Sequence, residues 1–286
     1  NLSTGLKENI NKKASYYFND INDYVNNNES FRELVLDNKI NTVFHLAACT
    51  DVRDSLDNPL NVYKTNLLSS ISIINICNRA GVEKFIFAST SAVYGEPKYL
   101  PIDEDHPTIP ISPYGFAKLK SYRITKKFRE KYNLPAYNAI IFNTESTLRP
   151  KDYLIPKICI AAINAKKFRK KTKFGNLKIA REWNWCSEQC EYLLKFLNKK
   201  PQDFILSNGK LFTAIQMIKF AFGYFNIDYK KFVLQDKKFM RKFDSEIKKS
   251  DFKKCLNRNH FNRKNKIYGK KMINKLIRYY QNENKY

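Results

Sequence analysis

The sequence contains few of the residues that mark metal sites, disulfide scaffolds or membrane spans. It has three histidines in 286 residues, and its six cysteines form no CxxC pair. No apolar run approaches the roughly 18 residues of a transmembrane helix, and residues 1–7 lack the apolar core of a signal peptide. We therefore predict no metal site, no membrane association, and a cytoplasmic protein whose cysteines are free thiols.

Acidic residues are also scarce, since 27 Asp and Glu stand against 52 Lys and Arg and the net charge is +25. A charge of this size is typical of nucleic-acid-binding proteins. The basic residues are spread along the chain, however, and the densest run, 166–173, is short. We interpret the charge as solvated lysines together with a site for an anionic substrate, and we predict no nucleic-acid partner. The alternative, a nucleic-acid-binding protein, predicts salt-dependent retention on heparin or DNA.

The apolar residues that are present indicate a folded α/β protein. Aromatic residues make up 14% of the chain and hydrophobic residues 43%. In the first half, short apolar runs typical of strands alternate with longer helical patterns. The expected strands are 14–18, 42–46, 85–88 and 136–142, and the expected helices are 29–37, 59–80 and 113–132. This alternation indicates βαβ units and a parallel sheet, whose ligands bind at the carboxyl ends of the strands.

After about residue 142 the pattern changes to helical segments separated by short strands. We predict helices at 156–164, 188–198, 214–225 and 271–281, and a strand at 204–206. The sequence therefore predicts two domains. Residues 1–142 form a Rossmann-like, doubly wound parallel sheet, and residues 143–286 form a smaller, mostly helical lobe that binds the substrate.

A tyrosine and a lysine four positions apart form the best candidate for catalysis. Ser112 and Pro113 are typical of the N-cap and first turn of a helix, so Tyr114 and Lys118 share one helix face. A free tyrosine has a pKa of about 10, and a neighbouring cation lowers it toward neutrality. The hydroxyl of Thr90, in the turn after the strand 85–88, would complete a proton relay.

Several stretches give the chain a resemblance to the nucleotide-sugar epimerases and dehydratases, which are extended short-chain dehydrogenases/reductases. The stretches are His45-Leu46-Ala47-Ala48, Asn66, Ser89-Thr90-Ser91-Ala92-Val93-Tyr94-Gly95 and Ser112-Pro113-Tyr114-Gly115-Phe116-Ala117-Lys118. The resemblance implies that Tyr114 takes a proton from a sugar hydroxyl, that Lys118 lowers the pKa of Tyr114, and that Thr90 shares the hydrogen bond to the reacting oxygen.

The same resemblance implies NAD as cofactor, with NADP as the alternative. Asp20 and Ile21 resemble the pair that contacts adenine, and Lys118 would also hold the ribose. Leu46, Ala47 and Ala48 would line the path of the dinucleotide, and Asn66 would pin their loop from the next helix. His45 fits better as a hydrogen-bonded core histidine, and Cys186 and Cys190, one helical turn apart, lack further metal ligands.

The second half looks most like GDP-mannose 4,6-dehydratase, which implies a nucleotide-diphosphate sugar as substrate. Two positions depart from that family, since Trp185 stands where it has a histidine and Gln189 where it has a tyrosine. Six residues match those that hold the sugar, the diphosphate and the nucleotide: Asn143, Glu145, Arg149, Lys157, Arg181 and Arg241.

Ala92 separates the two reactions of the family. Dehydratases carry Glu at this position as the acid that helps to expel the C6 hydroxyl, and a methyl group cannot transfer a proton. A 4-epimerase, which oxidises C4 and reduces it from the other face, needs no such acid. The sequence therefore favours a 4-epimerase, with a GDP-mannose 4,6-dehydratase or a non-catalytic truncated relative as alternatives.

The resemblance implies that part of the dinucleotide-binding domain is missing, which would explain the low glycine content. The chain has eight glycines, and by resemblance the first strand and glycine-rich phosphate loop would lie upstream of residue 1. We expect the sequence to be a fragment that binds NAD poorly, which a thermal-shift comparison with an upstream-extended chain would test. The resemblance also implies a homodimer packed through the helices after Pro59 and Pro113, or a homotetramer.

Overall fold

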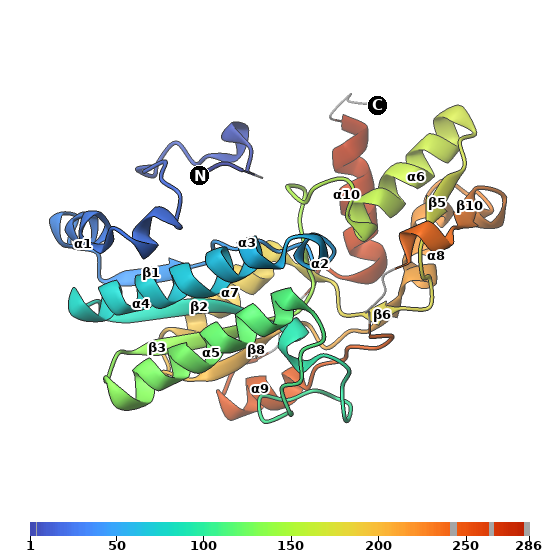
Figure 1. The fold of residues 1–286 in the computed structure, drawn as a ribbon. Helices are drawn as coiled ribbons and strands as arrows, with labels where there is room; N and C mark the ends of the chain where they lie inside the picture. Colours follow the sequence, from blue (N-terminus) through green and yellow to red (C-terminus); the bar gives the residue numbers. More distant parts are fainter. Residues whose placement is uncertain (4, 241–244, 263–265, 283–286) are drawn as a thin grey trace. The chain divides into compact units, whose positions relative to one another are not determined.

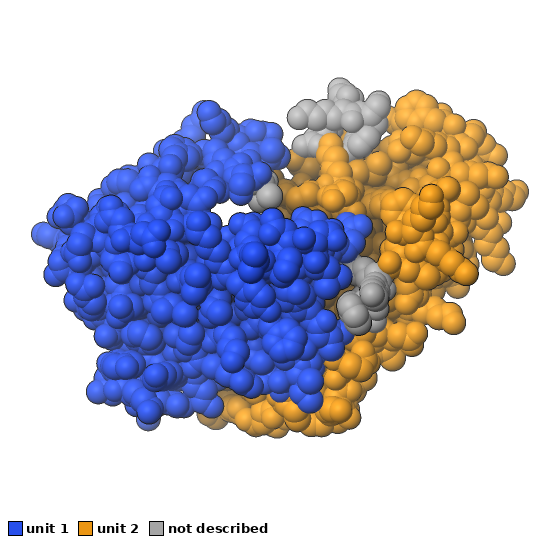
Figure 2. All heavy atoms as spheres, viewed as in Figure 1, with its two compact units in different colours: residues 1–95, 108–140, 199–204 blue, residues 96–107, 141–198, 205–286 orange. Residues whose placement is uncertain are grey.

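The computed structural model describes residues 1–3, 5–240, 245–262 and 266–282 (Figure 1). The chain divides into two compact units, which Figure 2 colours separately. Unit 1 comprises residues 1–95, 108–140 and 199–204, and unit 2 comprises residues 96–107, 141–198 and 205–286. Each unit is built from three separate stretches of the chain, whereas the prediction places one domain boundary after residue 142. That boundary stays a prediction.

The central sheet has the strand order β1-β2-β3-β8. Its strands are β1 (Thr42–His45), β2 (Lys84–Thr90), β3 (Ala136–Ile141) and β8 (Asp203–Leu206). β1 and β2 are parallel, with Thr42 opposite Lys84 and His45 opposite Phe87, so their carboxyl ends meet at one edge. The parallel, helix-flanked sheet confirms the predicted α/β class.

Helices of unit 1 cover the sheet with apolar faces. They are α1 (Asn28–Asp37), α2 (Asp54–Asp57), α3 (Pro59–Tyr63), α4 (Ser69–Arg79) and α5 (Pro113–Lys131). Figure 1 shows α4 and α5 side by side along the strands. Ile73, Ile74 and Cys77 of α4 pack with Phe85 and Phe87 of β2 in one buried cluster. This cluster holds the strand ends, and therefore the candidate site, in a fixed frame.

The helix predicted at 59–80 forms with one irregular turn. Asn58 caps its start by accepting a hydrogen bond from the backbone of Asn61. Between α3 and α4, residues Lys64–Leu68 form a π-helical turn, a feature common at functional sites. Gly81 follows the helix with φ +70°, a left-handed conformation that suits glycine and confirms the predicted stop.

One strand prediction was wrong. Residues 14–18 form no strand, and Tyr16, Tyr17 and Phe18 are exposed. No neighbouring strand among the described residues pairs with their backbone, so the apolar run alone does not make a strand. The strand predicted at 204–206 is confirmed as β8, which lies beside β3 in the central sheet; residue 204 belongs to unit 1 and residues 205 and 206 belong to unit 2. Phe142 donates a backbone hydrogen bond of 3.1 Å to Leu206.

Unit 2 is built around three packed helices, α6 (Leu154–Phe168), α8 (Ala214–Gly223) and α10 (Gly269–Asn282). The buried residues of α10 recur at helical spacing and form one apolar stripe against the other two. The remaining helices are α7 (Cys186–Phe196) and α9 (Phe252–Arg258). Three strand pairs complete the unit: β4 (Thr144–Glu145) with β7 (Asn184–Trp185), β5 (Thr172–Phe174) with β10 (Val233–Gln235), and β6 (Ala180–Arg181) with β9 (Phe212–Thr213).

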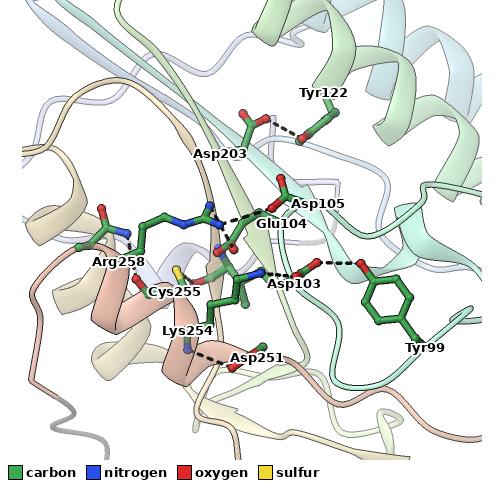
Figure 3. A network of polar contacts seen from close by, with 12 residues as sticks. Tyr99, Asp103, Glu104, Asp105, Tyr122, Asp203, Asp251, Lys254, Cys255 and Arg258 are labelled. Carbon is green, nitrogen blue, oxygen red and sulfur yellow. Dashed lines mark hydrogen bonds and ion pairs between the residues drawn. The ribbon is translucent and has the colours of Figure 1, made fainter.

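Within unit 2, the segment 96–107 is tied to α9 by a polar network (Figure 3). Asp103 accepts hydrogen bonds from Lys254 at 2.5 Å and from the hydroxyl of Tyr99 at 3.0 Å. Glu104 accepts a hydrogen bond of 3.1 Å from the backbone of Ile205. Arg258 lies 3.4 Å from Asp105. These contacts order a loop that the sequence predicts only as irregular. Among the described residues, no helix combines the length and the apolar character that crossing a membrane requires.

Candidate active site

A hydroxyl-lined turn follows β2, as the sequence predicts. The Thr90 hydroxyl accepts a hydrogen bond of 3.2 Å from the backbone of Ala92 and so caps the short helix Ser91–Tyr94. Gly95 then turns with φ +61°, and a Cβ there would lie 1.9 Å from the carbonyl oxygen of Ile109. The turn therefore needs glycine at this position, and it holds Thr90 at the carboxyl end of β2.

The helix α5 begins against this turn. Ser112 accepts a hydrogen bond of 3.1 Å from the backbone of Gly115, which confirms the predicted N-cap. A Cβ on Gly115 would lie 2.9 Å from the carbonyl oxygen of Ala92, so the close approach depends on glycine. Tyr114 is buried in an apolar cluster with Val62, and the methyl group of Ala92 packs against that cluster.

Lys118 is buried one turn further along α5, with 3% of its surface exposed. Its ammonium donates a hydrogen bond of 2.8 Å to the carbonyl oxygen of Ala88 and lies 4.7 Å from the ring centroid of Phe87. Burial lowers its pKa from 10.5 to about 7. A phenolate formed beside Lys118 would raise this pKa, so that Lys118 would be fully protonated near neutral pH. The protonation of Lys118 can therefore change with the ionisation of a neighbouring group.

His45 is a neutral core residue, as the sequence predicts. One ring nitrogen lies 2.8 Å from the hydroxyl of Ser70, and the ring is buried beside Phe85 and Phe87. Burial, and secondly the charge of Lys118, lowers the pKa of His45 to about 3. An imidazole with this pKa is uncharged at neutral pH. His45 therefore does not supply an imidazolium that could act as a general acid.

Asn66 holds the loop that follows β1. Its side chain accepts a hydrogen bond from the backbone N–H of Cys49 and donates one to the carbonyl oxygen of the same residue, each 2.8 Å long. Asn66 itself is buried in the π-helical turn. The loop residues before Cys49 include the exposed Leu46 and Ala47 and the half-buried Ala48. The contact expected of Asn66 is thus present, and its cofactor role stays a prediction.

Asp20 and Ile21 lie in a turn that reaches the same π-helical turn. The Asp20 carboxylate accepts hydrogen bonds from the backbone of Asn22 at 2.8 Å and from the side chain of Asn1 at 2.6 Å. The side chain of Asn22 in turn donates to the hydroxyl of Thr65 at 3.1 Å. This bond links the turn that contains Asp20 and Ile21 to the π-helical turn that contains Asn66. Contact of the pair with adenine stays a prediction.

Unit 2 brings together two of the predicted substrate residues. Glu145 at the end of β4 is buried, and its carboxylate lies 3.9 Å from Nε of Arg149. Neither of these two atoms has a hydrogen-bond partner among the described residues. Burial raises the pKa of Glu145 to about 7, against the smaller opposing effect of Arg149. Asn143 lies close by in the chain, and its carbonyl oxygen accepts two hydrogen bonds of 2.8 Å from Asn184.

The other basic candidates take different roles in the structure. The Lys157 ammonium lies 4.3 Å from the ring centroid of Phe239. Arg181 is buried and donates hydrogen bonds to the backbone carbonyl oxygens of Ala180 and Glu246, each 2.9 Å long. Arg181 therefore holds the backbone around residue 246, and its contact with a diphosphate stays a prediction. Arg241 lies outside the described residues.

Glu182 is a buried carboxylate that sequence reasoning missed. It accepts hydrogen bonds from the backbone of Ser250 at 3.1 Å, from the hydroxyl of Ser250 at 2.6 Å and from the hydroxyl of Ser207. Burial raises the pKa of Glu182 above its ordinary value, and these hydrogen bonds oppose the shift only in part. The sequence offered one sign of this site. Arg181 and Glu182 stand together between the apolar residues Ala180 and Trp183, and charged residues that are buried are usually paired. Arg181 and Glu182 together hold residues 245–250.

The parallel sheet and its helices form a Rossmann-like fold of the short-chain dehydrogenase/reductase type, and Tyr114 and Lys118 lie on its helix α5. The sequence model of the family described as GDP-mannose 4,6 dehydratase matches residues 2–276. The chain belongs to this family of nucleotide-sugar epimerases and dehydratases.

Some relatives are named as dehydratases and others as epimerases. A GDP-mannose 4,6 dehydratase of Caenorhabditis elegans is 33% identical over 187 residues, which are 63% of this chain and 49% of the relative. A UDP-glucose 4-epimerase of Lacticaseibacillus casei is 31% identical over 167 residues, 55% of this chain and 49% of the relative. The matched part therefore spans about half the length of these curated relatives.

A solved structure shares the fold over nearly the whole chain. It is the UDP-glucose 4-epimerase of Thermotoga maritima with UDP-glucose, with a TM-score of 0.87 and 23% identity. The match covers 99% of this chain and 89% of that one. At this identity the likeness establishes the fold, and it agrees with the Rossmann-like class predicted from the sequence.

Proposed function

We propose that the protein is an NAD-dependent nucleotide-sugar 4-epimerase. The observation that carries the proposal is the side chain at position 92. Ala92 packs against the cluster that holds Tyr114, in the turn capped by Thr90. Tyr114, Lys118 and Thr90 would move the proton of a sugar hydroxyl, and a methyl group stands where the resemblance places the acid of a dehydratase.

The proton chemistry follows from the Tyr114–Lys118 pair. Tyr114 would accept the proton of the C4 hydroxyl, and the Thr90 hydroxyl would share the hydrogen bond to the same oxygen. The Lys118 ammonium would stabilise the phenolate, and the phenolate would raise the pKa of Lys118 above its value of about 7. Returning the proton to the oxygen after the sugar has rotated would complete an epimerisation without loss of water.

The described residues of unit 1 fit a dinucleotide. Leu46, Ala47 and Ala48 follow β1 at the carboxyl end of the sheet, and two of them have side chains small enough for close approach to the backbone. Asn66 fixes the end of this loop through Cys49. Asp20, Ile21, Tyr114 and Lys118 would complete the site. NAD, with NADP as the alternative, would supply the hydride acceptor for the oxidation at C4.

The substrate would be a nucleotide-diphosphate sugar held by unit 2. The net charge of +25 favours an anionic substrate. Arg149 and Lys157 are candidates for the diphosphate, because charge-assisted hydrogen bonds from Arg and Lys suit phosphate oxygens. Asn143 and Glu145 would contact the sugar or the nucleotide. We further propose a homodimer or homotetramer, and the cytoplasm as its location, which suits six free cysteines.

A 4,6-dehydratase is the second candidate. It is supported by the match to the family described as GDP-mannose 4,6 dehydratase over residues 2–276. This reaction would need another acid to protonate the departing C6 hydroxyl. Glu145, with a pKa of about 7, has the acidity of such a group. A third alternative, a relative without catalytic activity, would share the fold alone.

Replacing Tyr114 by Phe tests the catalytic assignment. The Tyr114→Phe variant loses the proton acceptor and keeps the buried ring, so we expect turnover to fall by about 10²–10⁴-fold with an unchanged circular dichroism spectrum. Tyr132→Phe, an exposed position just past the same helix, is the matched control and should retain full activity. Retained turnover in Tyr114→Phe would refute the assignment.

A further inference from the structure

Cys186 and Cys190 lie one turn apart at the start of α7. Residues four apart on a helix share one face, so the two thiols are neighbours. Both are free, with Cys190 exposed and Cys186 half-buried. Burial, and secondly contact with the Cys190 thiol, raises the pKa of Cys186 to about 11. The proposed sugar chemistry uses neither residue.

We propose that Cys186 and Cys190 form a reversible dithiol site that closes to an intrahelical disulfide by exchange with small-molecule disulfides such as glutathione disulfide. The exposed Cys190 is the attacking residue, and Cys186 is the resolving one. The other cysteines do not offer such a pair. Cys77, Cys159 and Cys255 are buried, and the half-buried Cys49 has no second cysteine near it in the sequence.

The exchange proceeds in two balanced steps. The Cys190 thiolate attacks one sulfur of glutathione disulfide, forms a mixed disulfide and releases one glutathione thiolate. The Cys186 thiolate then attacks the Cys190 sulfur, forms the Cys186–Cys190 bond and releases the second glutathione thiolate. The two cysteines lose two protons and two electrons together, and one glutathione disulfide becomes two glutathione thiols. No other oxidant is needed.

The mixed disulfide on Cys190 places its sulfur beside Cys186, so the second step is intramolecular and proceeds from a small thiolate fraction. Arg149 lowers the pKa of Cys186 only in part, because burial outweighs it and keeps that pKa at about 11. Side chains four apart on a helix have Cβ atoms about 5–6 Å apart, whereas a disulfide needs about 3.5–4.5 Å. The first turn must therefore tighten. Cys186 is the first helical residue, and Trp185 before it makes no side-chain cap but is held in the pair of β7 with β4, so the tightening falls on the first turn of α7 itself.

Two tryptophans report on this turn. The sequence contains only Trp183 and Trp185, and Trp185 directly precedes Cys186 at the end of β7. Trp185 pairs with Glu145 of β4, so a change at the first turn of α7 acts on a residue fixed in a strand pair. Closure of the disulfide should change the intrinsic fluorescence, and a reducing agent should reverse the change.

Mass spectrometry tests the site directly. Trypsin cleaves after Arg181 and Lys195 and releases residues 182–195, which contain Cys186, Cys190 and no other cysteine. The folded chain is incubated with glutathione disulfide, and remaining thiols are then alkylated under denaturing conditions before digestion. We expect this peptide to lose two hydrogen atoms, to escape alkylation and to carry no glutathione. Dithiothreitol should restore both alkylation sites.

Single-cysteine variants separate the two steps. Cys186→Ser should accumulate a stable glutathione adduct at Cys190, because the resolving thiol is absent. Cys190→Ser should show neither an adduct nor a disulfide in this peptide. Both variants should keep the circular dichroism spectrum of the parent chain. A stable adduct on the parent chain, a disulfide between two chains, or an unchanged peptide would each overturn the proposal.

Discussion

The Lys118 ammonium donates a hydrogen bond of 2.8 Å to the carbonyl oxygen of Ala88, two residues before Thr90. This bond joins α5 to the end of β2, the two elements that carry Tyr114 and Thr90. Lys118 therefore fixes the geometry of the candidate site as well as its charge. Burial desolvates the ammonium and lowers the pKa of Lys118 to about 7.

Replacing Lys118 by Met should change how stability depends on pH. In the unfolded chain Lys118 keeps its proton up to a pKa of about 10.5, whereas in the folded chain it releases it near 7. The unfolded state therefore binds more protons between these values, and this residue makes the parent chain more stable as pH rises from 7. The stability of Lys118→Met relative to the parent should fall by about 1.4 kcal/mol per pH unit above 7.

Urea unfolding at pH 6, 7.5 and 9 measures this difference. Lys126→Met, an exposed lysine on the same helix, is the matched control and should follow the parent chain at every pH. A Lys118→Met difference that is constant across these pH values would show that Lys118 titrates normally in the folded chain.

Replacing Asn66 by Ala should loosen the loop after β1. The change leaves the N–H and the carbonyl oxygen of Cys49 without their partner, which should cost roughly 2 kcal/mol in the free energy of unfolding. Asn61→Ala removes an exposed contact of 3.7 Å to the Cys49 sulfur and should cost far less. Urea unfolding compares the two variants. Equal costs would contradict the role given to Asn66.

Replacing Glu145 by Gln should relieve the cost of an ionised buried carboxylate. In the folded chain Glu145 has a pKa of about 7, against 4.5 when unfolded, so the folded state holds the extra proton between these values. This residue therefore makes the parent chain less stable as pH rises from 4.5 to 7. The stability of Glu145→Gln relative to the parent should increase by about 2–3 kcal/mol from pH 5 to pH 8.

Denaturant unfolding at both pH values provides the measurement. Glu83→Gln, at an exposed position, is the control and should show no such increase. If Glu145→Gln behaves like Glu83→Gln, the carboxylate of Glu145 is ionised at ordinary pH and the buried pair with Arg149 is fully charged.

Replacing Ala92 by Glu should introduce the acid that separates the two reactions. We expect the Ala92→Glu variant to form some 4-keto-6-deoxy sugar in addition to the C4 epimer, because a carboxylic acid beside Tyr114 can protonate a departing hydroxyl. Ala92→Gln has nearly the same size without the acid and should form none. Proton NMR of the product identifies the methyl group of the deoxy sugar. Identical products from both variants would contradict the role assigned to position 92.

Local patterns in the sequence predict much of the fold and of the Tyr114–Lys118 site. The cap at Ser112, the helix spacing and the apolar strand before Thr90 are properties of neighbouring residues, and all three are present in the structure. The pairing of the strand 204–206 with β3 was not predicted, for a different reason. Strand pairing depends on contacts between distant residues, such as Phe142 with Leu206, which periodicity does not reveal.

The electrostatic properties of the site could not be predicted from the sequence for the same reason. The pKa of Lys118 depends on its burial against Phe87 and Ala88, and that of Glu145 depends on its burial beside Arg149. Glu182 and the two serines that donate to it are far apart in the chain. In each case the residue type is visible in the sequence, and its environment arises only on folding.

The most direct test of the proposed 4-epimerase follows the hydrogen on C4. The protein is incubated with NAD and with UDP- or GDP-hexoses that carry deuterium at C4, and the product is analysed by NMR. We predict a C4 epimer that retains deuterium at C4, formed by the parent chain and lost in Tyr114→Phe. A 4-keto-6-deoxy product with deuterium at C6 would contradict the epimerase assignment, and unchanged substrate would contradict catalysis by this chain.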